Sequence, residues 1–112
     1  MSGRIRVAPK EERTLDGVTF ASKAEMNRYA ELRMLERAGL IEGLEMQPRF
    51  VLQPKTDALR ELAYIADFRY RSRETNRVVV EDVKGMRTEV YKLKRKLFLA
   101  KYPDIDFREV EA

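Results

Sequence analysis

The sequence predicts one α/β (α+β) domain, a mixed sheet flanked by helices, with elements in the order helix, three strands, helix, strand. Apolar and polar residues alternate over residues 44–52, 62–70 and 105–110, which is the period of half-buried strands. Residues 78–83 are apolar on both faces, as in a central strand that is covered on both sides. The first three strands are expected to be antiparallel, whereas the fourth follows a helical crossover and is expected to pair in parallel.

The N-terminal part is predicted to be an arm followed by a helix. Residues 1–13 mix basic and acidic residues with little apolar material, which indicates a flexible arm before a single domain over residues 14–112. Ser22 and Glu25 form the Ser-x-x-Glu pattern of a capping box, so the first helix is expected to begin there. The helix is expected to end just before Gly39, because glycine commonly terminates helices.

The second helix is predicted from its ends and from its apolar spacing. Thr88 is the expected N-cap, and the helix should run to about Lys101, before Pro103. Apolar residues recur at helical spacing and are expected to face the core; they are Val90, Leu93, Leu97 and Ala100.

Positive charge is concentrated around this second helix. The chain has a formal net charge of +4 and a pI near 9.5. From Lys84 to Lys101 there are seven basic residues and one acid, Glu89. Such a stripe indicates a polyanionic partner, nucleic acid first, although a solvated helix face has the same composition. The residues expected to contact DNA are the basic and aromatic side chains of this segment, Arg87, Tyr91, Lys92, Lys94, Arg95 and Lys96.

Several classes of protein are excluded by what the sequence lacks. With no histidine and no cysteine, it has no Ser-His-Asp triad, Cys-His dyad, thiolate metal site or disulfide. Its five glycines are not grouped, so no phosphate-binding glycine loop indicates an NTPase or a dinucleotide enzyme. No apolar run approaches the ~20 residues of a membrane span and no signal-peptide core is present, which predicts a cytoplasmic protein without a membrane partner.

Acidic residues occur in two apolar runs where a buried strand would not normally carry them. Asp67 lies in the run 64–68, and Asp82 and Lys84 lie near the end of the run 78–85. Side chains two residues apart share one face of a strand, so Asp82 and Lys84 are expected side by side. Burying such a pair without a function is less favourable than burying an apolar pair. The pattern therefore predicts a divalent metal held beside a cation.

Each of these charges also has a purely structural explanation. Asp67 is compatible with a strand-end charge on an exposed face, and Asp82 and Lys84 with a simple ion pair. Glu25 is compatible with a capping role alone, because it is the third residue after Ser22.

Four further residues have weaker assignments. Glu81 points to the face opposite Asp82 and is expected to be a surface or interface charge. Tyr64 and Phe68 are expected in the core. Gln47 lies on the polar face of its strand, where the rim of an active site and plain surface are equally compatible with its position.

The element order and these motifs resemble the PD-(D/E)xK nuclease superfamily, which has the restriction-endonuclease-like αβββαβ core. The matching residues are Asp67, the Asp82-x-Lys84 pair and Glu25 of the first helix. Ala66 replaces the proline of the motif, and Asp82 replaces the commoner glutamate. The closer resemblance is to a family of short phage-encoded proteins and to small Holliday-junction resolvases, over residues 17–25, 47–50, 64–68 and 80–85.

The resemblance implies a metal-dependent site with Mg²⁺ or Mn²⁺ as cofactor. The cation would be held by Asp67, Asp82, the backbone carbonyl of Val83 and Glu25, which are oxygen ligands suited to hard cations. It would acidify a bound water and shield the charge of the scissile phosphate. Lys84 would orient that water or stabilise the developing phosphorane. Help from the helix after the lysine is also expected, where Tyr91 and Lys94 flank the apolar stripe.

The leading expectation is therefore a metal-dependent DNA endonuclease that hydrolyses phosphodiester bonds. A branched substrate such as a four-way junction is favoured, because 112 residues leave no room for a separate sequence-reading domain. Symmetric cutting of two strands also implies a homodimer. A phage nicking or end-processing nuclease, working in the host-cell cytoplasm, would use the same residues. A non-catalytic nucleic-acid-binding module, on DNA or RNA, is the alternative from another class.

Overall fold

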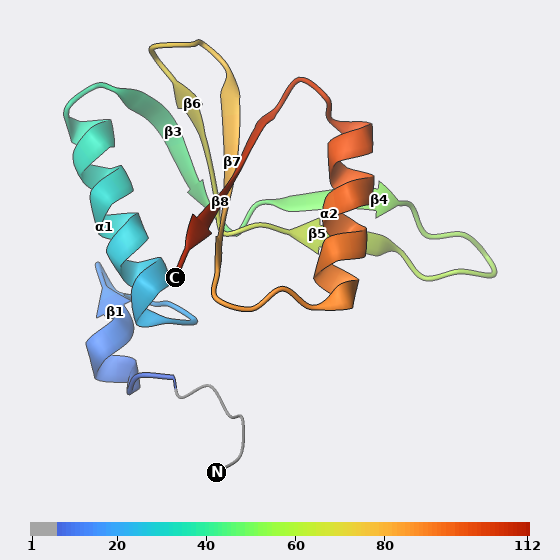
Figure 1. Cartoon of the computed structure of the whole chain (residues 1–112), viewed down its shortest axis with the longest axis horizontal. Coiled ribbons are helices and arrows are strands. Elements are labelled where there is room, and N and C mark those ends of the chain that lie inside the picture. The colour runs from blue at the N-terminus through green and yellow to red at the C-terminus, as the bar shows by residue number, and fades with distance from the viewer. Residues whose placement is uncertain (1–6) are drawn as a thin grey trace.

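The computed structural model describes residues 7–112 as an α+β fold (Figure 1). The N-terminal part contains a 3₁₀ turn and a small hairpin, and the rest contains two helices and six strands. In chain order the elements are the 3₁₀ turn Lys10–Arg13, β1 Thr14–Leu15, β2 Val18–Thr19, α1 Lys23–Arg37, β3 Ile41–Met46, β4 Arg49–Gln53, β5 Leu62–Ile65, β6 Phe68–Ser72, β7 Val78–Lys84, α2 Glu89–Lys101 and β8 Asp106–Glu111.

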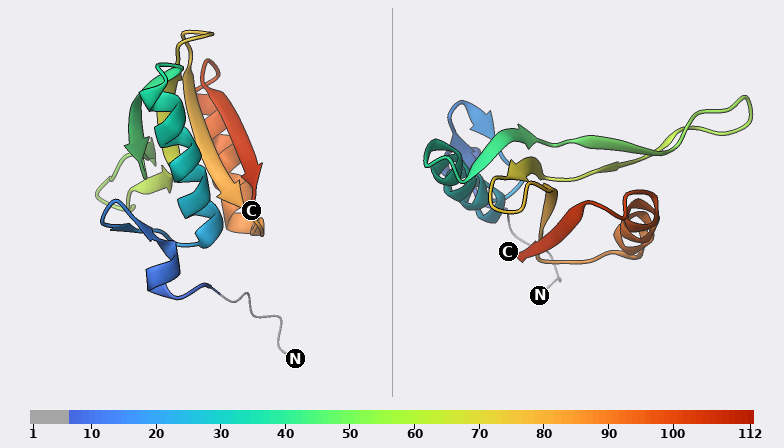
Figure 2. Two further views of the ribbon diagram at one scale, coloured as in Figure 1. Left: turned by 90° about the vertical axis from the view of Figure 1, so that its left-hand side faces the viewer. Right: turned by 90° about the horizontal axis from the view of Figure 1, so that it is seen from above.

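The central sheet has the strand order β3-β6-β7-β8. Its first three strands are antiparallel, and β8 pairs with β7 in parallel after the crossover through α2. The two helices lie on opposite sides of this sheet, as the views in Figure 2 show. The predicted αβββαβ order and the mixed sheet flanked by helices are confirmed.

Both faces of β7 are covered by apolar side chains. Val79 and Val80 are adjacent in this strand, point to opposite faces and are both fully buried. The cluster on the α1 face consists of Phe20, Tyr29, Leu32, Ile41, Phe68, Tyr70 and Val79. The cluster on the α2 face consists of Phe50, Tyr64, Ala66, Val80, Tyr91 and Phe98. The expected core positions of Tyr64 and Phe68 are therefore confirmed.

The two predicted strands 44–52 and 62–70 are each broken in the middle. Their outer halves form a separate two-stranded sheet, β4-β5, which extends past α2 (Figure 1). Pro48 has no N–H to donate to a strand ladder, and Gln47 before it adopts a left-handed backbone with φ 51°. Two hydrogen bonds join the two breaks: Gln47 N–H donates to Asp67 O at 2.9 Å, and Ala66 N–H donates to Pro48 O at 3.1 Å.

Both helices begin at the residues that the sequence predicts. Ser22 Oγ accepts a hydrogen bond from Glu25 N–H, and Thr88 Oγ1 accepts one from Tyr91 N–H, each at 3.1 Å. Gly39 follows α1 with φ 78°, the left-handed conformation that ends helices and that glycine adopts without strain.

The predicted core-facing stripe of α2 is wrong. Val90, Leu93 and Leu97 are 64%, 58% and 40% exposed, and the helix instead buries Tyr91 and Phe98. The helix carries two apolar rows, and the aromatic row is the one that packs against β4-β5, with Phe98 at 4.8 Å from Phe50 and 5.1 Å from Tyr64 between ring centroids. Aromatic rings bury more apolar area and gain from tilted ring contacts, so this row determines the orientation of the helix.

The chain before β1 is attached to the domain at Arg13, whose backbone carbonyl accepts a hydrogen bond from Phe20 N–H at 2.9 Å. Arg13 donates through its guanidinium to the backbone carbonyls of Ala8, at 2.8 Å, and Phe20. Residues 1–6 of the predicted arm lie outside the described residues. Within residues 7–112, no helix is long and apolar enough to cross a membrane.

A buried ion pair joins α1 to β7. Glu81 is fully buried on the α1 face, where Arg28 donates to its two carboxylate oxygens at 2.7 Å each and Tyr70 donates its hydroxyl to one of them. The expectation that Glu81 is a surface or interface charge is therefore wrong. The expectation that Glu81 points to the face opposite Asp82 is confirmed, but α1 covers that face of the sheet.

Removing Arg28 should strongly destabilise the fold. Arg28→Met leaves the Glu81 carboxylate buried with only Tyr70 as a partner, which is expected to lower the free energy of unfolding by about 3 kcal/mol. Chemical denaturation measures this. The double variant Arg28→Met with Glu81→Met should lose less than Arg28→Met alone, because no charge is then left unpaired.

The matched control is Glu31→Gln. Glu31 pairs with the same arginine at 3.0 Å, but its side chain is 63% exposed, so the change should be under about 1 kcal/mol. Equal losses for Arg28→Met and Glu31→Gln would contradict a structural role for the buried pair.

Candidate active site

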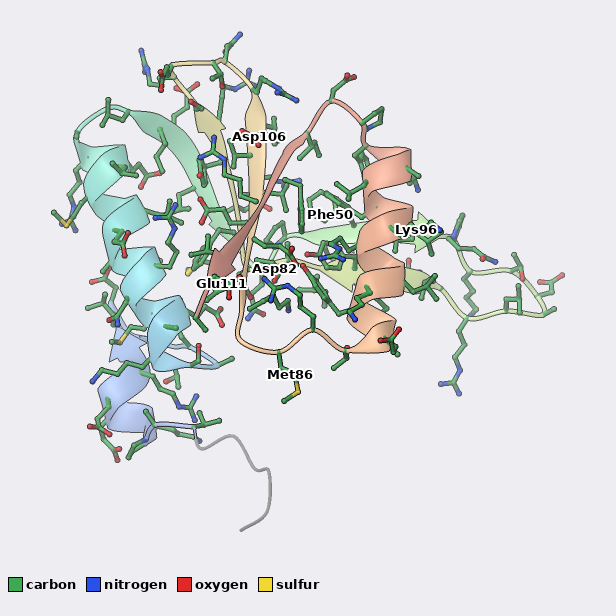
Figure 3. All side chains as sticks on the ribbon, in the orientation of Figure 1. Phe50, Asp82, Met86, Lys96, Asp106 and Glu111 are labelled. Atoms are coloured by element: carbon green, nitrogen blue, oxygen red, sulfur yellow. The ribbon has the colours of Figure 1, made fainter. Side chains whose placement is uncertain are left out.

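The acids and the lysine predicted from the sequence meet near the C-terminal end of β7. The β6-β7 register ends with Phe68 paired to Glu81, so Asp67, which directly precedes β6, lies near the part of β7 that carries Asp82. Asp67 lies at the break between β5 and β6, and Glu25 lies in the first turn of α1. Figure 3 shows Asp82 near the middle of the molecule, between the two helices.

A surface hollow of about 320 Å³ opens onto this region. Glu25 and Asp67 line it together with the end of β7 and the turn that follows; the remaining lining residues are Ala21, Ser22, Val83, Lys84, Gly85, Met86 and Ala112. Asp82 is not part of this lining, because its side chain is only 1% exposed. The hollow therefore gives solvent access to Glu25, Asp67 and Lys84, with Asp82 buried beneath the surface.

Asp67 is held against β7 by the backbone. Its Oδ2 atom accepts a hydrogen bond from Val83 N–H at 2.7 Å, and its own N–H donates to Glu81 O at 3.1 Å. The N–H and C=O of a strand residue point to the same side, so the Val83 carbonyl also faces the Asp67 side of β7. Burial raises the pKa of Asp67, while the Val83 hydrogen bond and the Lys84 charge oppose that rise.

Asp82 is a buried carboxylate without a hydrogen-bond partner. Within the described residues, neither Oδ1 nor Oδ2 has one, although the Lys84 ammonium lies 3.4 Å from Oδ1. Burial raises the pKa of Asp82 to about 6, and the Lys84 charge only partly opposes this effect. Buried carboxylates are normally satisfied by hydrogen bonds, by ion pairs or by a metal ion. Lys84 pairs with Oδ1 only, so Oδ2 has no partner within the described residues and is available to a cation.

Glu25 belongs to the same group of acids. Its side chain is 5% exposed, on the same buried side of α1 as Tyr29 and Leu32. Burial, followed by the charges of Asp67 and Asp82, raises its pKa to about 7. The Ser22 cap uses only the Glu25 backbone N–H, so capping of α1 does not require this carboxylate.

Lys84 is positioned by two contacts. Its ammonium lies 3.4 Å from Asp82 Oδ1 and 4.3 Å from the centre of the Tyr91 ring. A cation over an aromatic face is attracted by the ring quadrupole, so the ring helps to hold the lysine beside the carboxylate. The Tyr91 hydroxyl donates to Glu109 Oε2 at 2.7 Å, which fixes the ring in turn.

The predicted DNA contacts divide into two sets. Tyr91, Arg87 and Arg95 all donate to Glu109 Oε2, the last two at 3.2 and 2.8 Å. Lys92 pairs with the exposed Glu89 at 3.2 Å. Within the described residues, no ion pair engages Lys94 or Lys96, of which the first is half-buried and the second exposed.

Glu109 was not identified from the sequence. It lies on β8 directly opposite Asp82 in the parallel register, and its charge contributes to the raised pKa of Asp82. In the sequence it shares a strand face with Ile105 and Phe107, so it is a charge at an otherwise apolar position, a signal that the sequence reading missed. Only the register of the crossover strand brings it beside Asp82.

The residues at this site fit a hard divalent cation by ligand type. They supply carboxylate oxygens and one backbone carbonyl, the ligands that Mg²⁺ and Mn²⁺ prefer. Magnesium commonly uses only one or two protein carboxylates and completes its shell with water and substrate. In residues 7–112, no three acidic side chains are gathered closely enough to surround one ion. The pair that fits is Asp82, whose Oδ2 has no partner in this part of the chain, and Asp67, which accepts a hydrogen bond from the next residue of β7.

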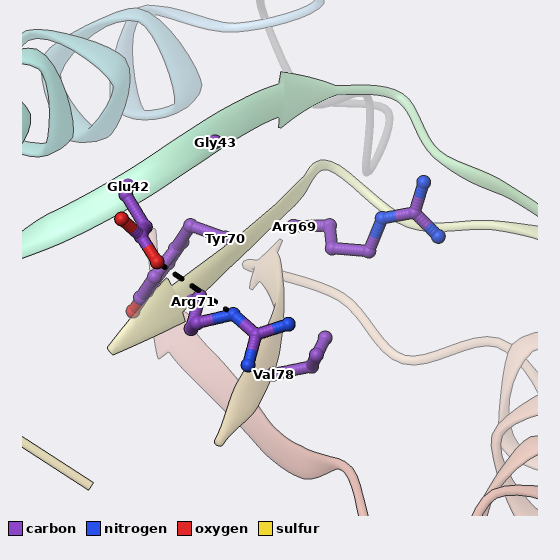
Figure 4. A pocket seen from close by; sticks show the side chains of 6 residues that line it. All are labelled: Glu42, Gly43, Arg69, Tyr70, Arg71 and Val78. Atoms are coloured by element: carbon purple, nitrogen blue, oxygen red, sulfur yellow. Dashed lines mark ion pairs between the residues drawn. The ribbon is translucent and has the colours of Figure 1, made fainter. Parts of the chain in front are cut away.

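A larger hollow elsewhere contains none of these acids. It has a volume of about 380 Å³ and crosses β3, β6 and β7, where Arg71 and Glu42 form an ion pair at 3.8 Å (Figure 4). Its lining residues are Glu42, Gly43, Arg69, Tyr70, Arg71 and Val78. The candidate site is therefore defined by its chemistry rather than by the size of its opening.

Fold and site together define a small α+β protein with carboxylates and a lysine gathered at the end of its central strand. The chain belongs to the family described as "Protein of unknown function (DUF1064)", whose model matches residues 9–111. No curated protein matches the chain, and no solved structure matches it.

The raised carboxyl pKa values predict an unusual dependence of stability on pH. Because Glu25 and Asp82 titrate near 7 and 6 when folded, above their ordinary 4.5 and 3.8, the folded chain binds more protons than the unfolded chain between about pH 4 and 7. The free energy of unfolding should therefore fall as the pH rises through this range. Asp82→Asn removes one charge and should raise that free energy by about 2 kcal/mol at pH 8, with little change at pH 4.

Urea denaturation in EDTA at the two pH values measures this effect. Asp57→Asn, in the exposed β4-β5 connection, is the matched control and should change stability at neither pH. If Asp82→Asn were destabilising at pH 8, the Asp82 carboxylate would be stabilising the fold rather than straining it.

Proposed function

We propose that this protein is a metal-dependent DNA endonuclease that hydrolyses phosphodiester bonds. The observation that carries the proposal is Asp82, a buried carboxylate that accepts no hydrogen bond within the described residues and whose Oδ1 atom alone pairs with Lys84, at 3.4 Å. The ion pair with Lys84 engages Oδ1 and leaves Oδ2 available, as a cation site requires. The resemblance of these residues and of the element order to the PD-(D/E)xK nucleases supports the same conclusion.

The proposed cofactor is Mg²⁺ or Mn²⁺, held by Asp67, Asp82 and the Val83 carbonyl, with Glu25 as a further carboxylate. When bound, the cation supplies the Lewis acidity that phosphodiester hydrolysis needs. Lys84 is the only basic side chain that lines the hollow, within the part of the chain that the structure describes. Its ammonium can orient the attacking water and stabilise negative charge that develops on the phosphate.

The proposed substrate is DNA, with branched DNA favoured. The chain has 23 basic and 19 acidic residues, and the free lysines of α2, Lys94 and Lys96, supply phosphate contacts that do not depend on sequence. Arg87 and Arg95 both donate hydrogen bonds to Glu109, which also accepts the Tyr91 hydroxyl. We therefore expect these two arginines to hold the Tyr91 ring in place as well as to attract phosphate.

A homodimer follows from the proposal if two strands are cut symmetrically. The exposed stripe of α2 supplies an apolar surface for a second copy, since Val90, Leu93 and Leu97 follow the 3-and-4 spacing of paired helices. Two active sites related by a twofold axis would then face two strands of one branched substrate.

Cleavage of labelled DNA tests the proposal. Purified protein is incubated with a four-way junction, linear duplex and single-stranded DNA of matched sequence, in Mg²⁺, Mn²⁺ or EDTA. We expect paired cuts near the branch point that require the metal and fall at least a hundredfold in Asp82→Asn and Lys84→Met. Asp57→Asn, on the exposed connection, should cut as the wild type does.

The other outcomes separate the alternatives. Metal-dependent cutting of all three substrates would retain the endonuclease and reject selectivity for branches. Single nicks, or cuts only at ends, would favour a nicking or end-processing enzyme and argue against the dimer. Tight DNA or RNA binding with no cutting in any metal would reject catalysis in favour of a binding module.

A further inference from the structure

A second hollow lies on the other side of Glu25 from Lys84. It has a volume of about 290 Å³, close to the lower limit of about 300 Å³ for small-ligand pockets. Glu25 lines both this hollow and the one that contains Asp67 and Lys84. The other lining residues are Val18, Thr19, Phe20, Met46 and Gln47. The two hollows therefore adjoin at one carboxylate of the proposed cleavage site.

Gln47 lies at this hollow in a strained backbone conformation. Its φ of 51° is left-handed, which costs a residue other than glycine about 1 kcal/mol or more. The conformation is maintained by the hydrogen bond from Gln47 N–H to Asp67 O and by the bond from Ala66 N–H to Pro48 O. The turn that carries Gln47 is thus attached to the backbone on both sides of Asp67, and strain of this kind clusters at functional sites.

The chemistry of the hollow fits one nucleotide. Met46, which is exposed, and the half-buried Val18 supply apolar surface of the kind that packs against a sugar or a base. The Gln47 side chain is exposed, and within residues 7–112 no hydrogen bond engages its amide. An amide N–H₂ is one of the neutral groups that proteins use to contact DNA phosphates.

We propose that this hollow binds the nucleotide adjacent to the scissile phosphate, and that the Gln47 amide donates a hydrogen bond to a phosphate oxygen of that nucleotide. The DNA strand then passes over Glu25, from the hollow with Lys84 to the hollow with Gln47. This inference rests on the proposed function, and it assigns Gln47 to the rim of the active site rather than to plain surface.

Two substitutions separate the amide from the backbone strain. Gln47→Gly keeps the left-handed turn without strain but removes the amide, and Gln47→Asn keeps an amide on a residue that tolerates this conformation. Gln53→Ala, on the exposed end of β4, is the matched control. Binding of uncleaved DNA is measured by fluorescence anisotropy in EDTA, and cleavage is measured separately in Mg²⁺.

Gln47→Gly is expected to weaken DNA binding about fivefold, the effect of one hydrogen bond, with an unchanged or raised melting temperature. Gln47→Asn should stay closer to the wild type, and Gln53→Ala should match it. Two further substrates carry a neutral methylphosphonate in place of the phosphate on the 5′ or the 3′ side of the cleaved one. One of these substrates should bind to the wild type and to Gln47→Gly with nearly equal affinity, because it already lacks the charged phosphate oxygen that the Gln47 amide contacts.

The inference is overturned if the wild type binds and cuts DNA while Gln47→Gly binds and cuts equally well. Fivefold weaker binding that persists undiminished on both methylphosphonate substrates would also overturn it, because the amide would then contact something else. If the wild type neither binds nor cuts DNA, both this inference and the proposed function fail, so the two failures are distinguishable.

Discussion

The buried ion pair between Arg28 and Glu81 is the constraint on which the arrangement of the site depends. It joins α1 to the central strand, with Glu81 fully buried and Arg28 donating to both of its oxygens. Glu25 lies one turn before Arg28 on the helix, and Asp82 directly follows Glu81 on the strand. The pair therefore fixes the relation between the helix and strand that carry two of the three acids, without occupying either acid.

The acids themselves oppose the fold that holds them. Burial raises the pKa values of Glu25 and Asp82, and nearby carboxylates add to the rise, Asp67 and Asp82 for Glu25 and Glu109 for Asp82. In the described part of the chain, Asp82 accepts no hydrogen bond. A fold selected for stability alone would not keep such a group, because burying a carboxylate with one ion pair and no hydrogen bond is unfavourable. The left-handed backbone of Gln47 is a second unfavourable feature, and it is hydrogen-bonded to the backbone of Asp67. The strained Gln47 turn and the buried acids are therefore neighbours, and a bound cation would offset the repulsion between the acids.

Local patterns in the sequence were sufficient for much of this structure. The Ser22 and Thr88 caps, the two-sided burial of Val79 and Val80, and the shared face of Asp82 and Lys84 each follow from short-range spacing. Contacts between residues far apart in the chain could not be predicted from such local patterns. Neither the burial of Glu81 by Arg28, 53 positions away, nor the Asp82–Glu109 register has a local signature. The core-facing side of α2 was predicted wrongly because the helix has two apolar rows, one aliphatic and one aromatic. Helical periodicity identifies both rows but does not indicate which of them packs against the sheet.

Direct measurement of cation binding tests the central claim, that the buried acids form a divalent metal site. Isothermal titration calorimetry with Mn²⁺ on the DNA-free protein should show saturable binding that Asp82→Asn weakens at least tenfold and Asp57→Asn leaves unchanged. The wild-type melting temperature should rise with Mn²⁺, because the cation binds the folded state and relieves the repulsion between the acids. Equal Mn²⁺ binding by the wild type and Asp82→Asn, or no binding by either, would contradict the account and leave Asp82 as a buried charge without a metal.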